Sequence, residues 1–267
     1  MMNQIDKAFA RCKEEGRAAL VGYLTAGDPK VTVSESLLLT LARSVDILEI
    51  GMPFSDPMAD GPVIQAASER ALAAGTHVRD VFNLTASVRR HHPELGIVLM
   101  GYANIPYAMG IEHFAQRAAE AGANGVLIVD VPVEEDDLWG RHLQRHGLHH
   151  IPLLAPTSSE ARIQATCAQA SGFIYYVSLT GITGADMGDI TGVQQKVAAI
   201  KQHTTLPVCV GFGIKTPEQA QAVARFSDGI VVGSAFVASV AEHVDDPEAA
   251  QREIDRRAQA IRNGLMR

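Results

Sequence analysis

Two carboxylates in the first quarter of the chain have the residue types and surroundings needed for proton transfer. Glu49 stands between Leu48 and Ile50 in a short apolar run, and Asp60 follows in the next loop. A carboxyl group buried without a partner has a raised pKa, so its protonated form is available near neutral pH. Two carboxyl groups in unlike environments can divide acid and base work. From position alone, an ion pair between Glu49 and a basic side chain is an equally good interpretation.

The loop that carries Asp60 is stiffened by prolines and glycines. It contains Pro53 and Asp56 and ends in Asp60-Gly61-Pro62. Proline fixes the backbone, so the two aspartates project from a restrained segment. A lone Asp before Gly-Pro more often caps a helix. The nearby Glu49 favours the catalytic interpretation of Asp60.

Three glycine-rich turns near the other end of the chain form a second set of candidates. They are SLTGITGADMGDITG over 178–192, GFGIK over 211–215 and GSAF over 233–236. Glycine lets the backbone approach a ligand closely, and amides at a helix amino terminus bind phosphate. Three such turns in succession predict a phosphate site. The four glycines of 178–192 also predict a loop that closes over the substrate.

The lysines and histidines limit the types of reaction that this chain can catalyse. None of the lysines lies within an apolar run, where desolvation would prepare it to form an imine, and only Lys215 is placed for such a role. His142 and His146 have the spacing of metal ligands, but they lack the Glu of HExxH and stand beside Arg141 and Arg145. We interpret these histidines as a solvated helix face and expect no metal.

The elements that must position these residues follow a regular alternation. Short continuous apolar runs predict buried parallel strands, each followed by a segment with helical spacing. The eight runs are residues 19–24, 47–51, 97–102, 125–131, 151–155, 173–178, 207–211 and 229–233. Eight units of about 33 residues each favour a (β/α)8 TIM barrel, an α/β fold, over an open doubly wound sheet. In such a barrel the reactive groups lie at the carboxyl ends of the strands.

Helices are predicted between these strands and after the last one. The segments with helical spacing include 111–121, 134–146, 159–170, 193–203 and 217–226. Thr216 and Asp246 each precede a proline, as expected for N-caps. The final helix has an apolar stripe of Ala249, Ile254, Ala258, Ile261 and Leu265. With no linker or low-complexity tract, residues 1–267 are predicted to form a single domain with additional helices.

Composition excludes several classes of protein. The formal charge of −7 over 267 residues argues against nucleic-acid binding, which needs a basic face. Three widely spaced cysteines without a CxxC pair argue against disulfides and thiolate metal sites. The charged amino terminus and the lack of a long apolar run argue against secretion and a membrane span. We therefore expect a cytoplasmic protein.

The block LEIGMPFSDPMADGPVIQAA, with SLTGITG, GFGI and GSA later in the chain, resembles the α subunits of tryptophan synthase. This resemblance extends over nearly the whole chain. It implies retro-aldol cleavage of indole-3-glycerol phosphate to indole and glyceraldehyde 3-phosphate, with no metal or cofactor in this chain. It also implies a partner, the β subunit, which holds pyridoxal phosphate and receives the indole, in an α2β2 heterotetramer.

Residue roles are carried over from the resemblance position by position. Glu49 matches the general acid-base, and Asp60 matches the carboxylate that contacts the indole nitrogen. The phosphate-binding positions are Gly184, Gly213, Gly233 and Ser234. The substrate-pocket positions are Tyr23, Met100, Tyr175, Thr183 and Phe212. Asp56 and Pro53 match the contact with the β subunit, with Asp28 in a similar role.

Two departures and three alternatives remain at this point. Val63 stands where the family pattern has Thr, and Asp186 stands where a basic residue is common. Both positions bear on loop closure. The alternatives are a stand-alone lyase that releases indole, a sugar-phosphate isomerase or epimerase barrel, and a noncatalytic regulator that binds a phosphorylated metabolite.

Overall fold

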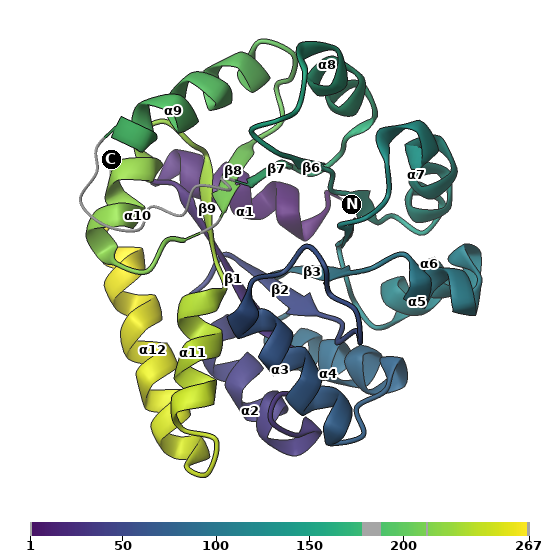
Figure 1. The fold of residues 1–267 in the computed structure, drawn as a ribbon, viewed down its shortest axis with the longest axis vertical. Coiled ribbons are helices and arrows are strands. Elements are labelled where there is room, and N and C mark those ends of the chain that lie inside the picture. The colour runs from purple at the N-terminus through teal and green to yellow at the C-terminus, as the bar shows by residue number, and fades with distance from the viewer. Residues whose placement is uncertain (1, 178–187, 212, 266–267) are drawn as a thin grey trace.

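The strands form one parallel sheet that curls into a barrel (Figure 1). The computed structural model describes residues 2–177, 188–211 and 213–265. The sheet order is β5-β4-β3-β2-β1-β9-β8-β7-β6. The strands are β1 (Ala19–Thr25), β2 (Ile47–Gly51), β3 (Gly96–Gly101), β4 (Gly125–Ile128), β5 (His149–His150), β6 (Leu153–Leu154), β7 (Ile174–Val177), β8 (Val208–Gly211) and β9 (Gly229–Val232).

Where a fifth strand was predicted at 151–155, the chain forms two short strands, β5 just before that range and β6 within it, so there are nine strands in place of eight. β5 pairs with β4, and β6 pairs with β7. Between them the Ile151 amide donates to the Val126 carbonyl at 3.0 Å, and the Tyr175 amide donates to the Pro152 carbonyl at 3.0 Å. Pro152 has no N–H to give to a ladder. The two pieces together close the sheet, and the predicted (β/α)8 barrel is confirmed.

Helices surround this sheet, except for α1, which lies across the barrel (Figure 1). They are α1 (Gln4–Glu14), α2 (Val31–Ala42), α3 (Pro62–Ala73), α4 (Val78–His91), α5 (Asn104–Met109), α6 (Ile111–Glu120), α7 (Asp136–Arg145), α8 (Glu160–Gln169), α9 (Gly188–Lys201), α10 (Pro217–Ala224), α11 (Ser234–Glu242) and α12 (Pro247–Asn263). A 3-10 turn, Val133–Glu135, precedes α7. The predicted helices between strands are confirmed with shifts of a few residues at their ends.

The predicted N-caps are confirmed, and one loop prediction needs correction. The Gln219 amide donates to the Thr216 hydroxyl at 3.3 Å, and the Ala249 amide donates to the Asp246 carboxylate at 3.0 Å. Of the loop predicted over 178–192, residues 188–192 lie in α9, because the helix begins at Gly188. Residues 178–187 lie outside the described part of the chain. The buried stripe of α12 starts at Ala250 instead of Ala249.

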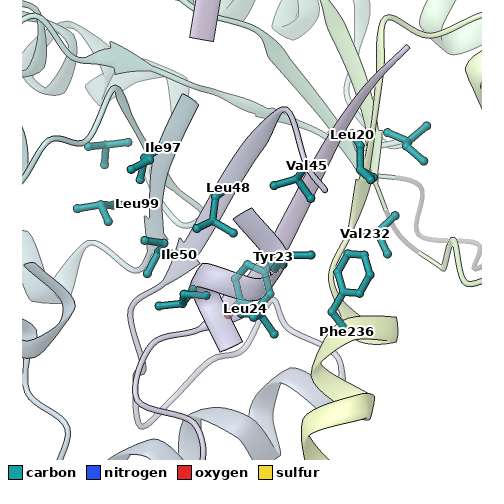
Figure 2. Packing of buried hydrophobic residues seen from close by; sticks show 14 of the residues in the cluster. Leu20, Tyr23, Leu24, Val45, Leu48, Ile50, Ile97, Leu99, Val232 and Phe236 are labelled. Atoms are coloured by element: carbon teal, nitrogen blue, oxygen red, sulfur yellow. The ribbon is translucent and has the colours of Figure 1, made fainter. Parts of the chain in front are cut away.

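The core has two parts, one on each side of the curled sheet. Outward-facing side chains such as Leu20, Leu48 and Val232 pack with helix residues such as Phe236 of α11 (Figure 2). Inward-facing side chains fill the barrel and pack against α1. Both faces of the strands are therefore buried, as their continuous apolar runs predicted.

Helix α1 covers the end of the barrel at which the strands begin. A methyl group added at Gly96 would lie 3.3 Å from the Ile5 side chain, and one added at Gly125 would lie 3.1 Å from it. The two glycines, which are the first residues of β3 and β4, thus make room for Ile5. The Phe9 ring lies 5.6 Å from the Phe173 ring, centroid to centroid. The helix therefore fills the amino-terminal end of the barrel.

A buried ion-pair cluster lies at the same end. The Asp46 carboxylate is fully buried and accepts hydrogen bonds from the Arg17 guanidinium at 2.6 and 2.7 Å and from the Leu20 amide at 2.9 Å. Burial alone would raise the pKa of Asp46, but the bonds from Arg17 and Leu20 hold that pKa below its usual value. Arg11 adds a longer contact at 3.2 Å. The cluster ties the starts of β1 and β2 together.

Candidate active site

A cavity of about 350 Å³ lies at the carboxyl ends of the strands, the end opposite α1. Most of the predicted site residues line it, although they come from strands and loops far apart in the sequence. Those that line it are Tyr23, Glu49, Asp60, Met100, Tyr175, Gly213, Gly233 and Ser234. The predicted positions Thr183, Gly184 and Phe212 lie outside the described residues. Val63, one of the two departures, also lines the cavity, while Asp186 lies outside the described residues.

Glu49 is aimed into the barrel from the middle of β2. It stands in register between Tyr23 of β1 and Val98 of β3 and is 1% exposed. Its Oε1 atom has no hydrogen-bond partner in the described part of the chain. Burial, with a smaller contribution from the charge of Asp60, raises the pKa of Glu49 to about 8. The ion pair considered as an alternative for Glu49 is absent among the described residues, and the carboxyl group is poised to hold a proton near neutral pH.

Asp60 is held by hydrogen bonds at the loop that precedes α3. The Tyr102 hydroxyl donates to its Oδ2 at 2.9 Å. The Gln65 side-chain amide donates to its backbone carbonyl at 2.9 Å. Burial raises the pKa of Asp60 above its usual value, and the bond from Tyr102 offsets only part of that shift. The N-cap of α3 is Gly61, with no side-chain cap bond, so the helix-cap interpretation of Asp60 is wrong.

Tyr102 is a site residue that the sequence reasoning missed. It directly follows β3 and is 3% exposed. Its hydroxyl accepts a hydrogen bond from the Ala59 amide at 3.1 Å while donating to Asp60, and its ring stacks on Phe54 with centroids 5.1 Å apart. The available signal was a polar aromatic residue immediately past the end of a strand. Tyr102 fixes the loop around Asp60 and the carboxylate itself.

Two tyrosines form the inner wall of the cavity, and glycines make room for their rings. A methyl group at Gly51 would lie 2.1 Å from the Tyr23 hydroxyl, and one at Gly211 would lie 2.6 Å from the Tyr175 hydroxyl. The Tyr23 and Thr25 hydroxyls share a hydrogen bond of 3.1 Å. With Met100, these rings give the cavity flat and apolar walls next to the two carboxyl groups. Such walls suit a planar aromatic ligand.

The predicted phosphate-binding glycines lie on the other side of the cavity. Gly213 has a φ of +77°, a left-handed conformation that favours glycine over other residues. Gly233 is the N-cap of α11, and Ser234 is the first residue of that helix. The first amides of α11 have no partner within the helix, and its dipole favours an anion there. This side of the cavity can hold a phosphate through backbone groups.

The residues predicted to contact a partner differ in accessibility. Asp56 is exposed, and its carboxylate accepts a hydrogen bond from the Ser55 hydroxyl at 2.6 Å. Pro53 is buried, which restricts it to shaping the loop in the isolated chain. Asp28 is also buried, and both of its carboxylate oxygens accept from Arg70 at 2.8 Å. Asp56 alone of the three presents its side chain at the surface.

The histidines with metal-like spacing pair with a carboxylate on the surface. His142 and His146 both contact Glu112, the latter at 2.9 Å. Within residues 2–177, 188–211 and 213–265, no group of three or more His, Cys, Asp or Glu side chains is arranged to hold a metal ion. None of the helices in those ranges has the length and apolar character needed to cross a membrane.

Comparisons with known proteins agree over nearly the full length. The family model for the tryptophan synthase alpha chain matches residues 9–266. The tryptophan synthase alpha chain of Zymomonas mobilis is 47% identical over 95% of this chain and 94% of its own length. That of Geobacter sulfurreducens is 52% identical over 88% of this chain and 89% of its own.

Solved structures give the same result at the level of the fold. The alpha chain from Legionella pneumophila superimposes with a TM-score of 0.90 at 39% identity, covering 99% of this chain and 97% of its own. A chain of tryptophan synthase from Mycobacterium tuberculosis superimposes with a TM-score of 0.91 at 32% identity, with 100% of both chains covered. This chain is similar to each of them in both sequence and fold.

Proposed function

Because the chain belongs to the tryptophan synthase alpha chain family, we propose that its cavity carries out that family's reaction with Glu49 and Asp60 as the catalytic pair. The reaction is the retro-aldol cleavage of indole-3-glycerol phosphate to indole and glyceraldehyde 3-phosphate. The observation that carries the assignment of roles is the buried Glu49 carboxyl, whose Oε1 has no partner among the described residues and whose pKa is raised to about 8, beside an Asp60 held by Tyr102.

Glu49 transfers a proton in both steps. Cleavage of the bond at indole C3 would expel a carbanion, so C3 must first be protonated. The Glu49 carboxyl group gives its proton to C3, and its carboxylate then removes the proton of the hydroxyl on the neighbouring side-chain carbon. The electrons of that O–H bond form the aldehyde carbonyl, the carbon-carbon bond breaks, and its electron pair restores the indole ring. Glu49 is protonated again at the end of the cycle.

Asp60 stabilises the charge that develops between these steps. Protonation at C3 leaves a positive charge on the ring nitrogen, and an ionised carboxylate nearby lowers the free energy of that state. Burial raises the pKa of Asp60, and the hydrogen bond from Tyr102 opposes that shift and so favours the ionised form. Two carboxyl groups in one cavity thus perform different work because one is unpartnered and the other accepts a hydrogen bond.

The remaining cavity residues bind the two ends of the substrate. Tyr23, Met100 and Tyr175 surround the indole ring, and the backbone at Gly213, Gly233 and Ser234 binds the phosphate. Thr183, Gly184 and Phe212 complete these two subsites by resemblance. No cofactor is required in this chain.

The indole passes to a β subunit, which holds pyridoxal phosphate in an α2β2 heterotetramer. The exposed Asp56 loop supplies part of the contact. We assign the chain a single domain over 1–267 and a cytoplasmic location, as fits an amino-acid biosynthetic enzyme.

The decisive experiment is an assay for indole from indole-3-glycerol phosphate, with and without a tryptophan synthase β subunit. We expect indole release that becomes faster in the presence of the β subunit. Release of indole with no complex and no change in rate would identify a stand-alone lyase. The lack of any indole in both conditions would contradict the proposed function.

A further inference from the structure

Lys215 lines the cavity, although no role has yet been assigned to it. It ends the GFGIK turn between β8 and α10 and shares the cavity wall with Gly213, Gly233 and Ser234. It is the sole basic side chain on the described part of that wall; Glu49 and Asp60 are the acidic ones. A cation at this position is therefore next to the backbone groups proposed to bind phosphate.

The backbone of Lys215 is fixed while its ammonium group is available. The Lys215 amide donates to the Gln219 side-chain carbonyl at 2.8 Å, and Gln219 also closes the capping box with Thr216. The side chain is exposed, and its ammonium forms no ion pair or hydrogen bond with any residue that the structure describes. Some other lysines are engaged: Lys201, for example, lies 2.8 Å from Asp228.

These surroundings decide between two roles for Lys215, imine formation and anion binding. A lysine that forms an imine needs an apolar, desolvated environment, whereas Lys215 stands at the solvent-exposed rim. An ammonium group at the rim can attract and bind an anion as a point charge. The position therefore suits recognition of the phosphate, not covalent chemistry.

We propose that Lys215 binds the phosphate group of the substrate and makes the cavity selective for phosphorylated ligands. This inference rests on the proposed function, because it assigns the phosphate to the side of the cavity formed by Gly213, Gly233 and Ser234. Backbone amides hold the phosphate in one orientation, and Lys215 adds a full positive charge that offsets the repulsion from Asp60.

The test uses Lys215→Gln in the full chain, with Lys215→Arg as the variant that retains the charge. For Lys215→Gln we expect KM for indole-3-glycerol phosphate to rise about five- to tenfold, as fits the loss of one partly exposed ion pair, with little change in kcat. Affinity for inorganic phosphate and for glyceraldehyde 3-phosphate, measured by calorimetry, should fall by a similar factor. Lys215→Arg should recover most of both losses.

Two further measurements distinguish a charge effect from a structural one. The affinity of wild-type protein for inorganic phosphate should fall as salt is added, and that of Lys215→Gln should fall less steeply, because the screened interaction has been removed. Affinity for indole, which has no phosphate, should be unchanged. Lys13→Gln is the matched control, because Lys13 is an exposed lysine on α1 at the other end of the barrel, and it should behave as wild type.

Unchanged phosphate affinity in Lys215→Gln would overturn the inference, as would an equal loss of indole affinity or a failure of Lys215→Arg to recover binding. The calorimetric measurement of phosphate affinity does not require the protein to release indole. If wild-type protein released no indole but bound phosphate through Lys215, the proposed function would fail and the phosphate site would stand.

Discussion

At the scale of single residues, the site depends on how differently the protein surrounds two carboxyl groups. Glu49 is buried, and one of its oxygens has no hydrogen-bond partner in the part of the chain that the structure describes, while Asp60 accepts a hydrogen bond from Tyr102. Burial without a partner favours the neutral acid, and a hydrogen bond to a carboxylate favours the ion. Each group is thereby prepared for its own step before any substrate binds.

Replacing Glu49 with Gln tests the proton-transfer role. The amide keeps the size of the side chain but cannot give or take the proton, so we expect indole release to fall by about 10²- to 10⁴-fold. Affinity for glyceraldehyde 3-phosphate, measured by calorimetry, should persist, because the phosphate binds on the other side of the cavity. Turnover at the wild-type rate would remove Glu49 from the mechanism.

The pH dependence of kcat/KM reports both carboxyl groups. Activity needs protonated Glu49, so it should fall as pH rises through about 8, the raised pKa of that group. Activity also needs ionised Asp60, so it should fall again at low pH, as Asp60 becomes protonated. The expected profile is a bell.

Tyr102→Phe should move only the acidic limb of this bell. The hydroxyl lowers the pKa of Asp60, so its removal should raise that pKa further and shift the acidic limb to higher pH. The basic limb, set by Glu49, serves as the internal control. A shift of both limbs, or of neither, would show that Tyr102 does not act through Asp60.

The sequence predicted the burial of Glu49 but left open whether it has a partner, and it did not predict the contact that holds Asp60. Leu48 and Ile50 flank Glu49 directly, so its burial can be inferred from its immediate neighbours. Tyr102 reaches Asp60 from a different strand, 42 positions along the chain. Local sequence does not specify which side chain from another strand completes such a contact.

At the scale of elements, the two ends of the strands have different roles. The carboxyl ends carry the cavity, while the amino ends of β1 and β2 are joined by the buried Asp46–Arg17 pair. An ion pair of this kind contributes little net stability compared with apolar packing, yet the loss of one partner is costly because it leaves a buried charge alone.

Asp46→Ala should therefore destabilise the protein by about 3–5 kcal/mol, since Arg17 would be left buried without its main partner. The measurement is urea unfolding followed by circular dichroism. Arg11→Gln is the control: the Arg11 side chain is 45% exposed, and its loss should cost about 1 kcal/mol or less. Equal costs for the two variants would contradict a special role for the buried pair.

Strands were easier to predict than the joint between β5 and β6. Continuous apolar runs located each strand to within a few residues, because burial on both faces leaves a clear composition signal. The fifth run was placed at 151–155, but the ladder contacts begin at His149 and are interrupted at Pro152. The polar pair His149-His150 gives no apolar signal, and its pairing depends on β4.

At the scale of the whole molecule, the Asp56 loop and α1 lie at opposite ends of the barrel. The loop follows the carboxyl end of β2 and carries an exposed carboxylate, as a contact surface for a β subunit requires. The resemblance identified this loop from its sequence. The structure adds that Asp28 and Pro53 are buried in the isolated chain, which restricts them to shaping the surface.

Asp56→Ala should weaken the complex with a β subunit by about tenfold in Kd, since it removes a charged contact from the interface. Calorimetric titration of the β subunit into each variant measures this. Asp245→Ala, in the exposed turn between α11 and α12, removes the same charge elsewhere and should leave Kd unchanged. The indole release of isolated Asp56→Ala should equal that of wild type. Equal Kd values for Asp56→Ala and wild type would place the contact elsewhere.

Ile5 and its helix fill the amino-terminal end of the barrel, so we expect ligands to reach the cavity from the carboxyl end alone. Pro62, Val63 and Lys215 are exposed at that end and line the cavity, so we expect substrate to enter and products to leave past them. A β subunit that docks at this end would receive indole close to the place where it forms. The close fit of Ile5 against Gly96 and Gly125, far from the cavity, thus closes one end of the barrel and leaves the carboxyl end for ligands.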